Sequence, residues 1–249
     1  MDRASKSRDW RVIVLVPTYN EAANVSSLSE RVLAADQRLQ ILIVDDASPD
    51  GTGDLADQIA SAEPRVHVLH RTGRRGYAAA SRDGMRWALE RNYEVICTMD
   101  GDLSHDPAYI PAMLASLGRG AGLAIGSRYV DGGSLEVDWG PERRATSRMG
   151  SAYARTMIGT SVRDCTSGFR CYKAEELARV PYDRVRADGY AFLIETLAML
   201  NRAHVLIEEL PITYVDRKHG RSKISGWIVL EALVQTTLLG LERLLGRRY

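Results

Sequence analysis

Short apolar runs alternate with helical patterns through the first half of this 249-residue chain. The runs end at polar or glycine-containing turns, which is typical of buried parallel strands. Strands that alternate with helices predict an α/β fold with a mostly parallel sheet covered by helices on both faces. The expected strands are 12–16, 41–44, 66–69, 95–99 and 123–126, and the expected helices are 23–35, 51–62, 77–91 and 107–117.

Two acidic pairs end strands of this expected sheet. Asp45 and Asp46 follow the second strand, and Asp100 and Asp102 follow the fourth. Ligands of open α/β sheets bind beyond the carboxyl ends of the strands, so we expect both pairs to face one crevice. The Asp-x-Asp spacing lets two carboxylates of one tight turn reach a hard divalent cation, which often shares its oxygen ligands with substrate phosphates. These residues therefore predict a nucleotide diphosphate bound through Mg²⁺ or Mn²⁺.

Composition narrows the class of protein. The chain has 33 Lys plus Arg against 32 Asp plus Glu, so no bulk charge calls for nucleic acid, and none is expected as a partner. Cys97, Cys165 and Cys171 show neither paired spacing nor matching histidines, which argues against a disulfide framework or a structural zinc site and fits a reducing cytosol. Residues 1–9 form a polar stub without a signal-peptide pattern, and no clean run of about 20 apolar residues marks a spanning helix.

The pattern changes after the fifth expected strand. Residues 127–141 are polar and rich in glycine, and a long irregular stretch inside a compact domain is usually a functional loop or disorder. Helices are expected again at 144–158 and 192–202, with one more strand at 205–211.

Residues 224–245 predict an amphipathic helix. Glu231, Gln235 and Glu242 line one face, and basic residues flank the segment. This pattern suits a helix at an anionic membrane surface or on a membrane-anchoring protein partner, and it equally suits a helix that packs on the domain. The apolar face consists of Trp227, Leu230, Val234, Leu238, Leu241 and Leu245.

Several motifs occur in an order shared with one enzyme family. The first four resemble the nucleotide-sugar half of a family 2 glycosyltransferase of the GT-A fold. They are Val16-Pro17-Thr18-Tyr19-Asn20-Glu21, the run 44–52 beginning Val44-Asp45-Asp46, Met99-Asp100-Gly101-Asp102 and Gly126-Ser127-Arg128-Tyr129. Arg143 with Ser147, the run 164–170 and the run 217–223 resemble dolichol-phosphate or polyprenol-phosphate mannose synthases. The resemblance covers about residues 12–223 and implies a GT-A domain at 10–223, after the stub and before an associating helix at 224–249.

The resemblance implies roles for individual residues. Asp102 would bind the metal directly, Asp100 would contact ribose or a metal-bound water, and Ser104 stands where some relatives carry Gln. A turn that only caps a helix is the other interpretation of Asp45 and Asp46. The residues implied to contact the nucleotide sugar are Pro17, Tyr19, Asn20, Glu21, Asp45, Asp46, Asp100, Asp102, Arg217 and Lys223.

A phosphate acceptor changes which catalytic groups are needed. A phosphomonoester is already anionic at neutral pH, so the reaction needs no general base. It needs cations, and guanidinium groups bind phosphate bidentately. We expect Arg128, Arg143 and Ser147 to bind the acceptor phosphate, and we expect Arg128, Arg143 and Arg217 to act in catalysis with Asp102. Arg71, Arg74 and Arg75 are expected to lie in a solvated loop.

The implied reaction is a metal-dependent, inverting transfer of mannose from GDP-mannose to a polyprenyl phosphate, which gives polyprenyl phosphomannose and GDP. The alternatives are a glucosyltransferase that uses UDP-glucose and a non-catalytic nucleotide-binding subunit. A processive synthase is disfavoured because the chain has no Gln-x-x-Arg-Trp motif. A receiver domain is disfavoured because the chain is about twice as long as a typical domain of that class. We expect a cytoplasmic protein, peripheral at the cytosolic face of the membrane.

Overall fold

The computed structural model describes residues 10–73, 75–187, 189, 191–217 and 226–246. The polar stub, Arg74 and the predicted ligand residue Lys223 lie outside the described residues.

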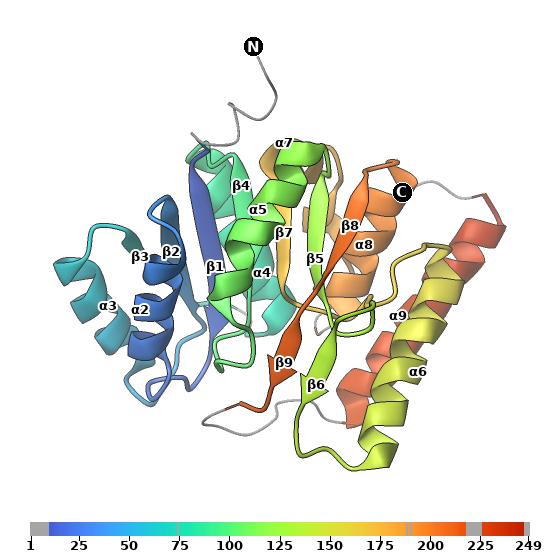
Figure 1. Ribbon diagram of the computed structural model, residues 1–249, viewed down its shortest axis with the longest axis horizontal. Helices are drawn as coiled ribbons and strands as arrows, with labels where there is room; N and C mark the ends of the chain where they lie inside the picture. Colours follow the sequence, from blue (N-terminus) through green and yellow to red (C-terminus); the bar gives the residue numbers. More distant parts are fainter. Residues whose placement is uncertain (1–9, 74, 188, 190, 218–225, 247–249) are drawn as a thin grey trace.

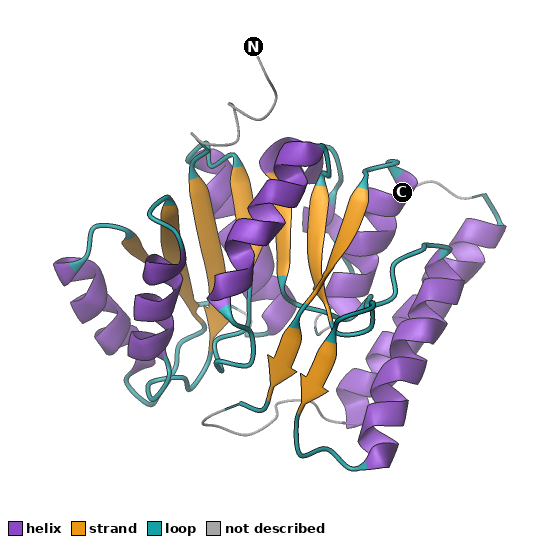
Figure 2. Cartoon of the chain, in the orientation of Figure 1, coloured by secondary structure: helices purple, strands orange, loops and turns teal. Residues whose placement is uncertain are grey.

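A seven-stranded sheet forms the centre of the protein (Figures 1 and 2). Its strand order is β3-β2-β1-β4-β7-β5-β8, and every neighbouring pair is parallel except the pairs that β7 makes with β4 and β5. All the expected strands are present, and β7 is one that the sequence pattern did not predict. The strands are β1 Val12–Thr18, β2 Leu39–Asp45, β3 Val66–His70, β4 Val95–Thr98, β5 Leu123–Ser127, β7 Arg170–Lys173 and β8 Ile207–Pro211.

Helices cover both faces of the sheet because alternate strand residues are apolar on both sides. Val12, Val14 and Val16 pack with α2 (Val25–Ala35) and α5 (Ile110–Arg119), and α3 (Thr52–Ala62) lies on the same side. Ile13 and Leu15 pack with α4 (Tyr77–Glu90) and α8 (Ala191–Arg202) on the opposite side. This confirms an α/β fold with a mostly parallel sheet flanked by helices.

Smaller elements complete the domain. The 3₁₀ helix η1 (Pro107–Tyr109) begins after Asp106, whose side chain accepts the Ala108 N–H at 3.0 Å, as expected for an N-cap followed by proline. Helix α7 (Ala174–Ala178) and the 3₁₀ helix η2 (Tyr182–Arg184) follow β7. The stretch 127–141, expected to be irregular, contains β6 (Ser134–Glu136), which pairs with β9 (Thr213–Val215) in a second, two-stranded sheet.

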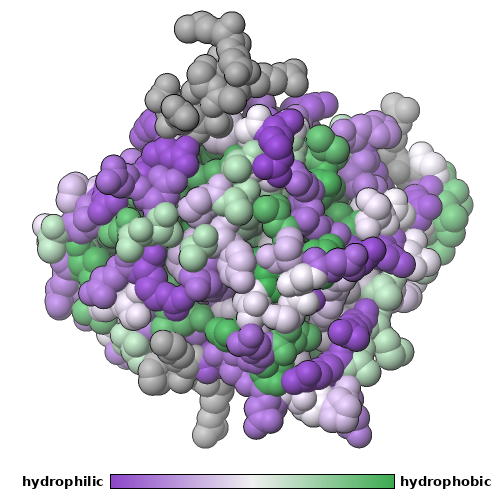
Figure 3. Space-filling model, viewed as in Figure 1, coloured by the Kyte–Doolittle hydropathy of each residue, from purple (hydrophilic) through white to green (hydrophobic). Residues whose placement is uncertain are grey.

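Two long helices, α6 (Pro141–Ile158) and α9 (Gly226–Leu244), pack against each other beside the β8 end of the main sheet (Figure 1). Helix α9 turns Thr236, Leu239 and Gly240 inward. All six residues of its predicted apolar face point outward, from Leu238 at 42% exposed to Trp227 at 75%. Figure 3 shows part of the resulting apolar surface in green at the right-hand edge. Within the described residues, no helix is long and apolar enough to cross a bilayer.

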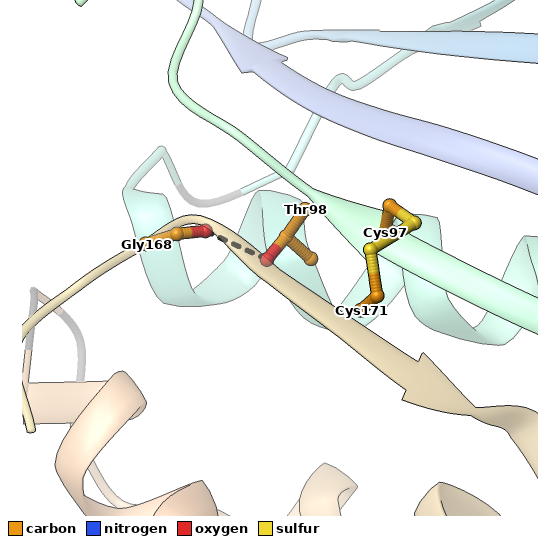
Figure 4. Close-up of a disulfide and its surroundings, with 4 residues drawn as sticks. All are labelled: Cys97, Thr98, Gly168 and Cys171. Atoms are coloured by element: carbon orange, nitrogen blue, oxygen red, sulfur yellow. Dashed lines mark hydrogen bonds between the residues drawn. A yellow bond between two sulfur atoms is a disulfide. The ribbon is translucent and has the colours of Figure 1, made fainter. Parts of the chain in front are cut away.

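Strands β4 and β7 are also joined covalently. Cys97 and Cys171 are directly opposite each other in the antiparallel ladder, with Cα atoms 4.0 Å apart, and they form a disulfide (Figure 4). The prediction against disulfide bonding is therefore wrong for this pair, because the unexpected strand β7 brings together two cysteines 74 residues apart. Cys165 is free, and burial raises the pKa of its thiol to about 12.

Candidate active site

The loops with the predicted site residues meet at one edge of the main sheet. The loops after β1, β2, β4 and β5 leave the carboxyl ends of parallel strands, which lie at the same edge. Strand β7 runs in the opposite direction, so the loop that precedes it reaches this edge too. The Thr98 hydroxyl fixes that loop by donating to the Gly168 carbonyl at 2.8 Å (Figure 4).

The loops after β1 and β2 are hydrogen-bonded to each other. Side chains of the second loop accept backbone N–H groups of the first: Ser48 from Asn20 at 3.0 Å, Asp50 from Ala22 at 3.1 Å and Thr52 from Glu21 at 2.9 Å. The Asp45 carboxylate accepts the hydroxyl of Ser48 at 2.5 Å and its N–H at 3.1 Å. These bonds hold the predicted nucleotide-binding residues close together. The Asp45 carboxylate itself stabilises the turn to which it belongs.

Asp46 takes part in a buried charge network. Its carboxylate accepts the Gly76 N–H at 2.6 Å and is ion-paired with Arg71, which also binds Asp83 at 2.7 Å. Arg71 is 8% exposed, so the expectation of a solvated loop is wrong for this residue. The carboxylate of Asp46 explains the burial, since a buried guanidinium requires paired acceptors.

Arg75 lies over a residue of the first loop. Its guanidinium carbon is 5.2 Å from the centre of the Tyr19 ring, and it donates to the Tyr19 hydroxyl at 3.3 Å and to the Ala47 carbonyl at 3.0 Å. Pro17 precedes Tyr19 at the end of β1, where it pairs with Val44 of β2. Arg75 and Tyr19 therefore lie together beside the loops that carry the predicted nucleotide-binding residues.

Asp100 and Asp102 lie in one tight turn. Leu103 has a φ of 64°, and the Asp102 carboxylate stabilises this strained turn by accepting the Ser104 N–H at 3.1 Å and hydroxyl at 2.5 Å. Burial, followed by the negative charge of Asp102, raises the pKa of Asp100 to about 7. The two carboxylates therefore repel each other in the absence of a cation.

This carboxylate pair fits a divalent metal. A cation between Asp100 and Asp102 would relieve their repulsion, and oxygen ligands suit Mg²⁺ and Mn²⁺. Among the described residues, no group of three or more His, Cys, Asp or Glu side chains forms a metal site, so diphosphate oxygens or water would have to complete the coordination. Ser104 donates its hydroxyl to Asp102 and in this arrangement orients that carboxylate.

A cationic and aromatic group connects this turn to the next loops. The Arg217 guanidinium is 3.6 Å from the Asp102 carboxylate. The centre of the Tyr214 ring is 5.5 Å from the centre of the His105 ring, at an angle of 72° between the ring planes, and 5.5 Å from the guanidinium carbon of Arg128. Burial lowers the pKa of His105 to about 4, so this histidine is neutral at physiological pH, and it accepts the Asp100 N–H at 3.3 Å.

Arg128 is held by a buried carboxylate. Asp164 accepts Arg128 Nε and Nη2, each at 2.7 Å, and the backbone N–H of the same residue at 3.0 Å. Burial alone would raise the pKa of Asp164, but the charge and hydrogen bonds of Arg128 hold it below its usual value. Thr166 also accepts Arg128 Nη2, at 2.9 Å. Arg128 is thereby fixed at the wall of a cavity of about 650 Å³ between β6 and α6.

The other predicted acceptor residues lie on α6. Ser147 shares a hydrogen bond of 2.6 Å with the Tyr129 hydroxyl, next to Arg128. The exposed Arg143 stacks on Trp139, with its guanidinium carbon 4.2 Å from the ring centre, and does not line the described cavity. The structure therefore brings Ser147 close to Arg128 through Tyr129, whereas Arg143 stacks on Trp139, and neither Ser147 nor Arg143 lines the described cavity.

Sequence reasoning assigned no role to Asp164, Tyr214 or Arg148. Asp164 begins the run 164–170, which is part of the family resemblance. An acidic residue in such a run indicates an ion-pair partner for one of the arginines. Tyr214 follows the expected strand 205–211 and carries no local signal. Arg148 is next to Ser147, and only its place at the cavity distinguishes it from a solvated arginine.

Several known proteins are similar to this chain over most of its length. The chain is 44% identical over 231 residues to an undecaprenyl-phosphate mannosyltransferase of Micrococcus luteus, with 93% of this chain and 94% of the relative covered. It is 40% identical to a polyprenol monophosphomannose synthase of Mycolicibacterium smegmatis, with 99% and 93% covered. It is 34% identical to a dolichol-phosphate mannosyltransferase of Pyrococcus furiosus, with 90% of this chain and 62% of the relative covered.

A solved structure shares the fold. Glucosyl-3-phosphoglycerate synthase of Mycobacterium tuberculosis, crystallised with Mn²⁺ and UDP, superposes with a TM-score of 0.64 at 17% sequence identity, with 99% of this chain and 84% of that chain covered. The same protein has been crystallised with Mg²⁺ and UDP. The profile named glycosyl transferase family 2 matches residues 13–180. Together with the relatives at 34–44% identity, this match shows that the chain belongs to glycosyltransferase family 2.

Proposed function

We propose that this enzyme transfers mannose from GDP-mannose to the phosphate of a polyprenyl monophosphate, with inversion at the anomeric carbon and with a divalent metal. The names of relatives that cover nearly the whole chain support mannose as the sugar and a polyprenyl phosphate as the acceptor. The observation that carries the proposal is the series of contacts from Asp100 through His105 and Tyr214 to Arg128, because it joins a carboxylate pair that suits a metal to a cavity that suits a phosphate.

The donor end of the site needs groups that bind a diphosphate. Asp100 and Asp102 would hold the cation. When bound there, the cation would neutralise negative charge on the departing diphosphate. Arg217, 3.6 Å from Asp102, adds a positive charge at the same place. Tyr19 and Arg75 close the side where the nucleoside would lie, next to the loop of Asp45 and Asp46.

The acceptor end needs groups that orient a phosphate. Arg128 is fixed by Asp164, so its remaining N–H groups are preorganised, and the Ser147 hydroxyl lies beside the Tyr129 hydroxyl. A phosphate oxygen attacks the anomeric carbon as the carbon–oxygen bond to the diphosphate breaks on the opposite face. The phosphate is already ionised, so no side chain has to remove a proton.

We further propose that α9 holds the enzyme at the cytosolic face of a membrane, where the lipid acceptor is found. Five outward apolar residues of α9, with Leu245 directly after it, suit a bilayer surface, and Arg247 and Arg248 follow in the sequence, where basic residues favour anionic lipids. Because α9 packs on α6, this arrangement would bring the acceptor cavity close to the lipid.

Transfer of labelled mannose tests the proposed function. Purified protein is incubated with GDP-mannose labelled in the sugar, a polyprenyl phosphate and Mn²⁺ or Mg²⁺, and the lipid phase is then counted. We expect label in the lipid phase, and its loss when a chelator removes the metal. Label that stays in the aqueous phase with both metals would contradict the proposal.

A further inference from the structure

The acceptor cavity has a basic wall and an apolar wall. Three arginines, Arg128, Arg144 and Arg148, supply the basic side groups. Leu135, Pro141, Ala145 and Met149 supply the apolar ones, and none of the described lining residues is acidic. This combination fits a phosphate attached to a hydrocarbon chain.

Two of the three arginines already have partners. Asp164 takes two N–H groups of Arg128 and cancels its charge. Arg144 donates to the backbone carbonyls of Trp139 at 3.1 Å and Val137 at 2.7 Å, which fixes the start of α6. A phosphate in this cavity would therefore meet Arg128 as part of a neutral ion pair, and Arg144 with some of its N–H groups already hydrogen-bonded.

Arg148 differs from the other two. Among the described residues it makes no ion pair or hydrogen bond, and its guanidinium carbon lies 5.9 Å from the centre of the Tyr129 ring. Tyr129 is the residue whose hydroxyl binds Ser147, so Arg148, Tyr129 and Ser147 meet at one point. Arg148 also lines a second cavity, of about 250 Å³, with Tyr129, Arg155 and Arg163.

We propose that Arg148 binds the phosphate of the prenyl phosphate acceptor and supplies a positive charge that no described carboxylate cancels, together with unused N–H donors, which select a phosphomonoester. This inference rests on the proposed function, because it deepens the acceptor site of the same reaction. The planar fork of Arg148 would hold two phosphate oxygens, while Arg128 and Ser147 orient the phosphate from the other side. The apolar wall formed by Leu135, Pro141 and Met149 would take the first isoprene unit.

The test uses a short, water-soluble prenyl phosphate, so that binding to a membrane does not enter. Arg148→Ala is compared with the wild type and with Arg155→Ala, which removes the same charge from the same helix outside the larger cavity. We expect Arg148→Ala to raise the acceptor KM about tenfold or more, the effect of losing a charge-assisted hydrogen bond, with the donor KM unchanged. Arg155→Ala should keep both values, and Arg148→Lys should recover part of the loss.

A second measurement separates this inference from the proposed function. Calorimetric titration of the same prenyl phosphate, with GDP present, measures acceptor binding even if no mannose is transferred. If the wild type transfers no mannose, the proposed function fails, while weaker binding by Arg148→Ala still supports the phosphate role. An unchanged acceptor affinity in Arg148→Ala, or an equal loss in Arg155→Ala, would overturn the inference. Because Arg148 is exposed, the variants should fold, which circular dichroism checks.

Discussion

Arg128 and Asp164 form a bidentate ion pair in which the Asp164 side chain is completely buried and that of Arg128 is 10% exposed. The pair connects the loop after β5 to the loop before β7. It therefore fixes the cavity wall and also joins two segments of the chain that are 36 residues apart.

Asp164→Ala should lower the free energy of unfolding by about 3 kcal/mol, because it leaves a buried guanidinium without its counter-charge. Urea unfolding followed by circular dichroism measures this. The matched control is Asp131→Ala, which breaks the pair of Arg163 with a fully exposed carboxylate and should leave the unfolding curve in place. Equal curves for the two variants would show that the buried pair does not stabilise the fold.

Metal affinity should depend on pH. Burial and then the charge of Asp102 raise the pKa of Asp100 to about 7, so a proton occupies the proposed metal site at low pH. Protonation of Asp100 stabilises the metal-free protein fully at a pH below 3.8, the ordinary pKa of this carboxyl group. This stabilisation is lost as the pH rises through about 7, its pKa in the folded protein. Mn²⁺ affinity, titrated with GDP present, should therefore rise by up to about tenfold between pH 6 and pH 8.

The control for this pH dependence is Asp100→Asn, which cannot titrate at that position. Its Mn²⁺ affinity should be weaker and nearly flat over the same range. A wild-type affinity that is the same at pH 6 and pH 8 would exclude competition between a proton and the metal at Asp100.

Arg217→Ala should reduce turnover by about 100-fold while GDP affinity changes only a few-fold. Arg217 lies 3.6 Å from Asp102, where in the proposed reaction negative charge develops on the leaving diphosphate, so its effect should be largest in the transition state. Turnover and GDP binding are measured on the same preparation. A normal turnover number would remove Arg217 from the catalytic group.

The outward face of α9 should control membrane binding. Replacing Trp227, Leu230, Val234, Leu238 and Leu241 by serine should lower partitioning into anionic phospholipid vesicles at least about tenfold, because these exposed side chains would otherwise enter the interface. Flotation with vesicles measures the partitioning. The inward residues Thr236, Leu239 and Gly240 are kept, so the helical content should not change, and partitioning equal to wild type would refute an anchoring role for this face.

The sequence predicted the elements that depend on local pattern. The strands from β1 to β5 are short apolar runs with clear turns, and the acidic turn at Asp100 follows one of them. Strand β7 was missed because its sequence, Arg170-Cys171-Tyr172-Lys173, is short and half polar. The disulfide between Cys97 and Cys171 was missed for the same reason, since only the ladder places the two residues together.

Tertiary contacts account for the other differences. The amphipathic pattern predicted the helix α9, but which face points outward depends on how it packs against α6 and α8. The role proposed for Arg148 depends on the partners of its neighbours, Asp164 for Arg128 and the carbonyls near Trp139 for Arg144. Such partners are distant in sequence or belong to the backbone, so residue patterns alone do not reveal them.

The most direct test of the proposed reaction is mass spectrometry of the lipid products formed from a polyprenyl phosphate, a divalent metal and equal amounts of GDP-mannose and UDP-glucose, with Asp102→Asn in parallel. The donors are distinguished by isotopic labelling of one hexose. We predict a phosphohexose lipid that carries only the sugar of GDP-mannose and that is absent with Asp102→Asn, although the variant keeps its fold. A product that carries the sugar of UDP-glucose would contradict the proposed donor, and near-normal product formation by Asp102→Asn would contradict the proposed metal site.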